Sequence, residues 1–317
     1  MRLGEIYSFF VAQGIATDMR TRGEIRKKLS ETKREFRKLN KLEKSLFDED
    51  NFTNPYSDIR ILNGDRKTQV KRILVGIDIE VGEMLLADRL SEKGKTIDLI
   101  LAHHPEGKAL AGLYDVMGLQ AHLLQNIGLK PDIAKALMGQ RIEEVARRLH
   151  AGNHNRAVDA AKLLGLPLMC CHTPSDNHVV RYLQNMMDAR KPKTLQDVVH
   201  LLLREPEYRD AVVNKAGPKI LLGKPQDKAG KIIVDMTGGT EGSKEIFARI
   251  SQAGVDTVLC MHLSEEHFNK VKPEHIHVIV AGHIASDNLG MNLLLDKLQK
   301  KDSFEIVGCS GFKRVKR

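Results

Sequence analysis

Aromatic residues are scarce in this sequence of 317 residues, and tryptophan is absent. Phenylalanine and tyrosine together make up only 4% of the chain, which argues against a stacking platform for single-stranded nucleic acid, where bases lie on aromatic rings. Cysteine is also rare: there are four, without a CxxC pair and with two adjacent in sequence. We therefore expect no disulfide framework, reduced cysteines and a cytoplasmic protein.

Long hydrophobic runs are missing as well. The N-terminal stretch IYSFFVAQGIA is apolar but short, and it lacks a basic lead-in and an A-x-A cleavage site. It indicates neither a membrane span nor a signal peptide. Hydrophobic residues still make up 42% of the chain, and the length suffices for two ordinary domains or one large one. The composition is typical of a soluble globular protein.

The formal net charge of +9 is concentrated near the N-terminus. Residues 20–44 contain 11 lysines and arginines and 4 glutamates, a local charge of 11 − 4 = +7. Apolar residues recur there every three or four positions from Ile25 to Leu46, which predicts a charged amphipathic helix. Such a helix can bind nucleic acid or a membrane surface. The more common arrangement, a solvated face on a docked helix, is our expectation.

Strand and helix patterns alternate after the turn-rich segment DEDNFTNPYSD. RILVGIDI and IDLILAHH are typical of buried strands, and VGEMLLADRLSEKG between them is typical of a helix that ends at a glycine. This order predicts parallel strands in an α/β fold. Residues 76–104 and 234–262 share the same order of elements, so that Asp98 and His104 correspond to Asp256 and His262.

The sequence therefore predicts two related α/β halves that face a shared metal site, with an added N-terminal helical segment. The expected divisions are an N-terminal helical extension over 1–57, a first half over 58–190, a connecting helical segment over 191–230 and a second half over 231–317.

Histidines and aspartates recur where the expected strands stop. His103 and His104 follow DLILA, and two further apolar runs are followed by His172 with Asp176 and by His283 with Asp287. Each alone is also typical of an ordinary loop, but the strand ends of an α/β sheet form the edge where ligands bind. Imidazoles and carboxylates suit zinc, iron, manganese or cobalt. Two adjacent histidines favour two metals with a carboxylate between them.

A glycine-rich segment, MTGGTEGS, lies between an expected strand and helix. Its backbone amides are candidates for binding a phosphate, although it matches neither a Walker loop nor GxGxxG. A tight strand-to-helix turn explains it equally well. The candidate cofactor-binding residues are Gly238, Gly239, Thr240, Gly242 and Ser243.

Five segments in order, VGIDIEVGEML, DLILAHHPEG, CCHTPSD, MTGGTEGS and VIVAGHIASDNLG, resemble the Nif-three-like dinuclear metal-centre family, also called GTP cyclohydrolase I type 2-like. The resemblance covers about residues 58 to 295. It implies two divalent metal ions per chain and a homohexameric ring. The ligands that it implies are His103, His104, Asp176, His283 and Asp287, where family members usually have glutamate in place of Asp287.

The leading functional hypothesis is a metal-dependent hydrolase that acts on a nucleotide or a phosphorylated small molecule. His262, His267 and Glu106 are candidates for moving protons or orienting the substrate. Two alternatives are a ring-shaped adaptor that binds nucleic acid or protein, with structural metals, and a metal store.

Overall fold

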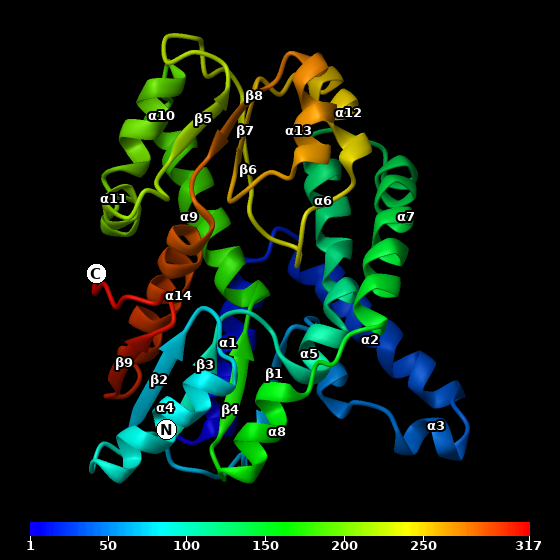
Figure 1. The fold of residues 1–317 in the computed structure, drawn as a ribbon. Helices are drawn as coiled ribbons and strands as arrows, with labels where there is room; N and C mark the ends of the chain where they lie inside the picture. The colour runs from blue at the N-terminus through cyan, green and yellow to red at the C-terminus, as the bar shows by residue number, and fades with distance from the viewer.

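The computed structural model describes residues 1–317, in which helices surround two β-sheets (Figure 1). The strands are β1 (Ile59–Asn63), β2 (Arg72–Gly76), β3 (Leu99–Ala102), β4 (Leu168–Cys171), β5 (Lys219–Leu222), β6 (Ile232–Asp235), β7 (Thr257–Cys260), β8 (His277–Val280) and β9 (Glu305–Cys309). The helices are α1 (Leu3–Thr17), α2 (Arg22–Lys38), α3 (Lys41–Ser45), α4 (Val81–Glu92), α5 (Gly107–Ala111), α6 (Gly118–Asn126), α7 (Pro131–His150), α8 (Arg156–Leu163), α9 (Thr173–Arg190), α10 (Leu195–Leu202), α11 (Pro206–Val213), α12 (Phe247–Gln252), α13 (Glu265–Val271) and α14 (His283–Gln299). The short 3-10 helices are η1 (Glu49–Phe52), η2 (Leu113–Met117), η3 (Lys244–Ile246) and η4 (Lys272–Glu274).

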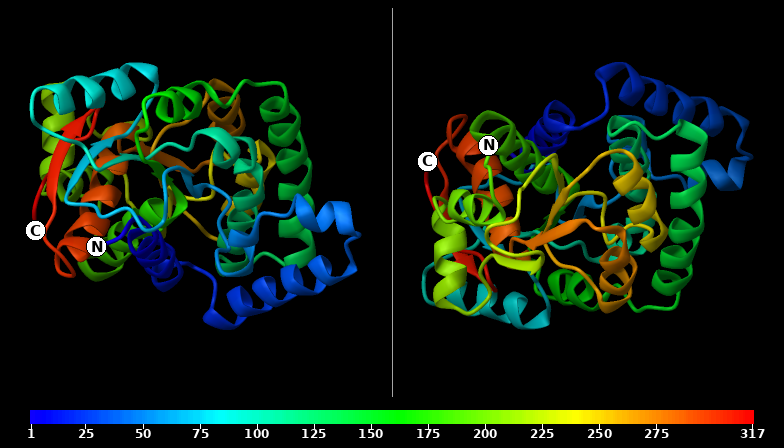
Figure 2. Two further views of the ribbon diagram at one scale, coloured as in Figure 1. Left: turned by 90° about the horizontal axis from the view of Figure 1, so that it is seen from below. Right: turned by 90° about the horizontal axis from the view of Figure 1, so that it is seen from above.

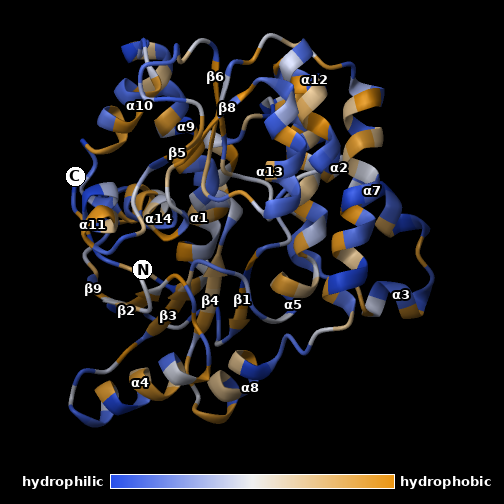
Figure 3. Ribbon diagram, turned by 45° about the horizontal axis from the view of Figure 1, so that its top comes forward, coloured by the Kyte–Doolittle hydropathy of each residue, from blue (hydrophilic) through white to orange (hydrophobic).

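The first sheet has the strand order β1-β4-β3-β2-β9. Strands β2, β3, β4 and β9 run parallel, and β1 lies antiparallel to β4 at one edge. Every residue of β3 and β4 is buried, as expected for central parallel strands covered on both faces. Hydrophobic residues are concentrated in the strands (Figure 3).

The second sheet repeats the plan of the first in the order β5-β8-β7-β6. Its edge strand β5 is antiparallel to β8, its other strands are parallel, and β5 carries a register shift like that of β1. Asp98 accepts a hydrogen bond from the backbone N–H of Arg72, and Asp256 accepts one from Lys231, at the corresponding strand starts. The prediction of two related α/β halves is confirmed.

Helices α9 and α14 follow the equivalent strands β4 and β8 and pack against each other between the sheets (Figure 1). Their contact is close at Gly290, where a Cβ atom would lie 2.6 Å from the carbonyl oxygen of Ser175. A larger residue would force the helices apart. After α14 the chain returns to the first sheet, where β9 pairs with β2.

The N-terminal helices differ in their environment. Leu3, Ile6 and Phe10 of α1 are fully buried in the core of the first half. Helices α2 and α3 extend away from the body of the molecule (Figure 2), and Leu42 and Leu46 are 69% and 77% exposed. The basic stretch forms two helices because the chain leaves α2 at residue 39 and Asn40 caps α3.

None of the helices combines the length and the hydropathy that crossing a membrane requires.

Candidate metal centre

The two adjacent histidines lie just beyond the C-terminal end of β3. The backbone N–H of His103 donates to the carbonyl of Gly76, and that of His104 donates to the carbonyl of Ile77, both at 2.9 Å. These bonds continue the pairing with β2 past the end of the strand, which fixes both backbones. The side chain of His103 is fully buried, whereas that of His104 is 25% exposed.

The first turns of α14 contribute two further side chains to the centre, His283 and Asp287. Gly282 has φ +107°, and a Cβ atom there would lie 2.6 Å from the carbonyl oxygen of Ala216, so only glycine fits this turn. The helix begins at His283 and places Asp287 one turn further along the same face. The Asp287 side chain is 1% exposed.

The side chains that follow β3 and those at the starts of α9 and α14 form two groups of ligand-type atoms, and Asp287 belongs to both groups. His103 Nε2 lies 3.3 Å from Asp287 Oδ1 and 3.4 Å from Asp176 Oδ1. The other carboxylate oxygen, Asp287 Oδ2, lies 3.5 Å from His104 Nε2 and 3.6 Å from His283 Nε2. The two oxygens of Asp287 therefore face different histidines. We call these groups the inner triad (His103, Asp176 and Asp287) and the outer triad (His104, His283 and Asp287).

The separations between these atoms fit ligands of a common cation. Nitrogen and oxygen ligands lie about 2.0–2.2 Å from a divalent ion such as zinc, so two ligands at a tetrahedral angle are about 3.4 Å apart. Both nitrogens of His103, both carboxylate oxygens of Asp287 and Asp176 Oδ1 are buried without a hydrogen-bond partner. Buried polar groups without partners are costly, and bound metal ions would supply the missing interactions of His103 Nε2 and of the carboxylate oxygens.

The protonation states of His103 and Asp287 also suit metal ligands. Burial lowers the pKa of His103 to about 4, which keeps its imidazole neutral at pH 7. Burial opposes ionisation of Asp287, but the neighbouring histidines, above all His103, lower its pKa to about 2. A neutral imidazole and an ionised carboxylate are the forms that bind metal.

His172 was absent from the predicted ligand set, yet the structure places it beside His103 and His104 in a third group of ligand-type atoms. Its Nδ1 lies 3.0 Å from Asp58 Oδ2, and its Nε2 lies 3.6 Å from Asp176 Oδ2. Burial alone would lower the pKa of His172, but the carboxylates of Asp176 and Asp58 raise it to about 9. The signal in the sequence was its position directly after the apolar run LPLMCC, four residues before Asp176.

Carboxylates behind the histidines orient the rings. Asp78 Oδ1 lies 2.7 Å from His104 Nδ1, which leaves Nε2 of that ring facing Asp287. Asp58 has the same relation to His172 and also accepts a hydrogen bond from the hydroxyl of Thr173. Such outer carboxylates fix the tautomer of a metal-binding histidine. Neither aspartate was predicted: Asp58 ends the turn-rich segment DEDNFTNPYSD, and Asp78 lies in RILVGIDI, which has the pattern of a buried strand.

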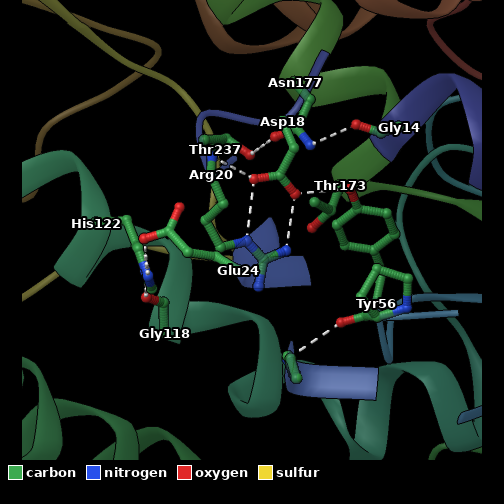
Figure 4. A network of polar contacts seen from close by, with 12 residues as sticks. Gly14, Asp18, Arg20, Glu24, Tyr56, Gly118, His122, Thr173, Asn177 and Thr237 are labelled. Atoms are coloured by element: carbon green, nitrogen blue, oxygen red, sulfur yellow. Dashed lines mark hydrogen bonds and ion pairs between the residues drawn. The ribbon is translucent and has the colours of Figure 1, made fainter. Parts of the chain in front are cut away.

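Polar contacts hold α9 in place between the halves (Figure 4). Asn177, next to Asp176, donates to the carbonyl of Gly14 in α1 and accepts a hydrogen bond from Thr237 of the second half. Below it, Asp18 accepts hydrogen bonds from Arg20 and from the hydroxyl of Tyr56. The bond from Asn177 to Gly14 ties the N-terminal segment to the helix that carries part of the inner triad.

The three candidate catalytic residues have different surroundings. The ring centroid of His262 lies 4.8 Å from that of His283, and its Nδ1 lies 3.3 Å from Glu241. His267 is buried, with Nδ1 2.8 Å from the hydroxyl of Ser264 and Nε2 3.0 Å from a loop carbonyl, so both of its nitrogens are engaged. Glu106 lies apart from His262 and His267. Burial and the charge of Glu80 raise its pKa to about 7, and no histidine of the triads contributes to this shift.

A cavity of about 80 Å³ adjoins the triads. Of the predicted cofactor-binding residues, Gly239, Thr240 and Gly242 line this cavity, and Gly238 and Ser243 flank them in the chain. Gly238 and Gly239 have φ +95° and +87°, conformations that glycine adopts readily. Phosphate binding by this loop remains a prediction. We call this cavity, lined also by Gln120, Asp235, Glu241 and His262, the loop pocket.

Asp235 in the loop pocket gives a prediction for stability. Burial raises its pKa to about 6, and His262 opposes this effect. An unfolded aspartate has a pKa of about 3.9, so the metal-free fold loses stability as the pH rises from about 4 to 6. We expect Asp235→Asn to be more stable than the parent by roughly 2 kcal/mol at pH 7 and nearly equal at pH 4. Urea denaturation with chelator at both pH values measures this, and an equal difference at both would contradict it.

Comparison with known proteins shows which proteins share this fold. The family model Duf34/NIF3 (NGG1p interacting factor 3) matches residues 142–311. The chain is similar to the crystal structure of a NIF3 superfamily protein from Sphaerobacter thermophilus, with a TM-score of 0.71, 28% identity and coverage of 80% of this chain and 91% of that chain. It shares the fold of reduced HcgD from Methanocaldococcus jannaschii, with a TM-score of 0.51, 14% identity and coverage of 79% and 88%.

No curated protein matches the sequence. The family model nevertheless spans more than half of the chain, and it includes α9, α14 and the second sheet. The chain therefore belongs to the DUF34/NIF3 family.

Proposed function

We propose that the chain is a dinuclear metal-dependent hydrolase that binds two divalent ions, one in each triad. The observation that carries the proposal is the arrangement of Asp287, whose two oxygens each face a separate pair of ligand-type side chains. A carboxylate shared in this way is the expected bridge of a two-metal site. The donor set of imidazole and carboxylate suits zinc, iron, manganese or cobalt.

Two divalent ions held in the triads would act as Lewis acids and provide a water nucleophile at neutral pH. Asp78 would keep the ring of His104 in the tautomer that it presents to the centre, and Asp58 would hold the ring of His172 in its orientation. His262 stands next to His283 and is 46% exposed, so it can exchange a proton with a substrate at the outer triad.

Glu241 holds His262 in this position. Its Oε1 atom accepts a hydrogen bond from the backbone N–H of Ser264, and its Oε2 atom lies 3.4 Å from His267 Nδ1. Burial would raise the pKa of Glu241, but hydrogen bonds from His262 and Ser264 lower it to about 2. In the proposal His267 is a positioning residue, and a proton-carrying role for Glu106 remains a prediction.

A small organic substrate fits the surroundings of the centre. Besides the loop pocket, His283 also lines a cavity of about 740 Å³ between α11, the start of α14 and the C-terminal residues. Sites for small molecules are typically about 300–1,000 Å³ and mostly apolar. Nucleotides and phosphorylated small molecules are the proposed substrate class, with the phosphate bound by the metals.

The central test is metal content followed by activity. Protein purified without chelator should contain two equivalents of divalent metal, measured by elemental analysis. Removal of the metal should abolish the hydrolysis of a phosphoester or nucleotide from a screened panel, and the native metal should restore it. Metal without turnover of any substrate in the panel would instead support a metal store.

His104→Ala is expected to remove roughly one metal equivalent and to leave the fold intact, because His104 belongs only to the outer triad and to the group with His172. The matched control is His150→Ala, since His150 is exposed at the end of α7. Elemental analysis and circular dichroism of both variants make the comparison. Full occupancy in His104→Ala would contradict the assignment of two metals.

A homohexameric ring and a cytoplasmic location are further parts of the proposal. The family membership supports the first, and four free cysteines, three of them buried, support the second. Light scattering coupled to size-exclusion chromatography measures the number of subunits, and a monomer at micromolar concentration would contradict the ring.

The exposed basic arm formed by α2 and α3 favours nucleic-acid binding as a second candidate function. Its lysines and arginines are mostly exposed, and the helices that carry them project from the body of the molecule (Figure 2). Binding through phosphates weakens steeply with added salt. RNA or DNA affinity that falls with salt and persists in chelator would support this adaptor function over the hydrolase.

A further inference from the structure

The loop pocket is rich in hydrogen-bond acceptors. Three carboxylates, from Asp176, Asp235 and Glu241, line it together with four histidines, and neither lysine nor arginine does so. Two of these acidic groups already have partners: Asp176 belongs to the inner triad, beside His103, and Glu241 accepts a hydrogen bond from the backbone N–H of Ser264. Asp235 accepts no side-chain or backbone hydrogen bond on its carboxylate.

A second acceptor in the pocket is also unpaired. Gln120 is 6% exposed, and its Oε1 atom is buried without a hydrogen-bond partner. Its Nε2 atom donates to the carbonyls of Gly238 and Thr240, which fixes the orientation of the amide. Oε1 then lies against Gly242 in the pocket wall, where a Cβ atom would be only 2.5 Å away. A buried acceptor without a donor is a site where a ligand can supply one.

The geometry argues against a metal ion as this ligand. Asp235, Glu241 and His262 do not form a group of ligand atoms within 4.8 Å of one another, in contrast to the triads. At the end of the pocket formed by Asp235 and Glu241 an anion would be repelled by the two carboxylates, which argues against phosphate at that end, away from His172 and the metals. The volume of about 80 Å³ is large enough for roughly three groups of the size of water.

We infer that the loop pocket binds a compact organic cation, the amino or guanidino group of the substrate, with Asp235 and Gln120 as its acceptors. The inference rests on the proposed function, in which the reacting bond of the same substrate lies at the triads. Because His283 belongs to the outer triad and also lines the loop pocket, one small molecule can reach both. The substrate would then carry a cationic group within a few bonds of the group bound by the metals.

Methylguanidinium is the probe, and N-methylurea is its neutral counterpart of nearly the same shape. Both are titrated into the full-length protein as purified and followed by saturation-transfer NMR, and the metal content of the same sample is measured. We expect saturable binding of methylguanidinium, at least tenfold weaker binding of N-methylurea, and a loss of about tenfold or more in Asp235→Asn. Asp132→Asn, which removes an exposed carboxylate on α7, should bind the probe as the parent does.

Several results would overturn the inference. These are the absence of saturable methylguanidinium binding, equal binding by Asp235→Asn, and displacement of the probe from the pocket by inorganic phosphate. The proposed function fails separately, through the absence of metal in the parent protein. Asp235→Asn should keep the parent metal content, because Asp235 belongs to neither triad.

Discussion

Asp287→Asn is expected to lower the affinity for divalent metal by at least about 10- to 100-fold, the range typical of changes around metal ligands. The carboxylate of Asp287 faces His103 through one oxygen and both His104 and His283 through the other. Asparagine replaces one of these oxygens with an amide nitrogen that donates hydrogen bonds and does not ligate a metal. It also removes the negative charge that two cations share. Competition with a chromophoric chelator measures the affinity.

Asp287→Glu is the matched variant, because it keeps the charge and both oxygens and restores the residue that we expect in similar proteins. It should retain metal far better than Asp287→Asn. If Asp287→Asn binds metal as well as the parent protein does, Asp287 is not a ligand, and the two triads have no shared member. A loss of helicity in Asp287→Asn would point to a structural role at the start of α14.

Much of the fold could be predicted because its central strands are short apolar runs that stop at polar residues. Parallel strands buried on both faces have this pattern, and β3, β4, β7 and β8 show it. The second sheet repeated the pattern at equal spacing. The placement of β9 could not be predicted, because its pairing with β2 joins residues more than 200 positions apart and no local signal specifies such a partner.

The role of the N-terminal segment shows a similar limit. A helix that is apolar over Leu3 to Val11 gives no sign of which half it covers, and its packing into the first core depends on the complementary surface of α9 and the strands. The basic pattern of residues 20–44 did predict a charged helix with a solvated face, but that helix was expected to dock on the molecule, whereas α2 and α3 extend away from it (Figure 2). Its division at Asn40 depends on a local cap that hydrophobic periodicity alone does not show.

The candidate site was predicted in part because its side chains follow strand ends. His103, His104, His283 and Asp287 meet in the structure, and Asp176 joins them from α9. No local pattern in the sequence shows that His104 and His283, about 180 positions apart, both lie beside the carboxylate of Asp287. Asp58 and Asp78 orient the histidines but were not predicted. Asp58 ends a turn-rich segment, where aspartate has many ordinary roles, and Asp78 lies in a segment with the pattern of a buried strand.

Arg317→Met is expected to destabilise the fold by about 3 kcal/mol. Arg317 donates two hydrogen bonds to Glu207, at 2.8 and 2.6 Å, and one to Glu205 at 2.9 Å. The side chains of Glu207 and Glu205 are only 2% and 10% exposed. Methionine keeps much of the length of arginine but leaves two buried carboxylates without their cation, and an uncompensated buried charge is costly. The midpoint of urea denaturation, at a fixed metal concentration, measures the change.

The matched control is Arg147→Met, whose parent side chain is 70% exposed and lies 3.8 Å from Glu143 on the same helix. Exposed pairs of this kind contribute about 0.3–0.5 kcal/mol, so the two arginine variants should differ several-fold in effect. Glu207→Gln in the Arg317→Met background removes one of the stranded charges. Asn292 still donates to the remaining side-chain oxygen of residue 207, and the double variant should recover part of the lost stability. If the double variant is less stable than Arg317→Met, the cost arises from lost packing of the arginine stem rather than from the buried carboxylates.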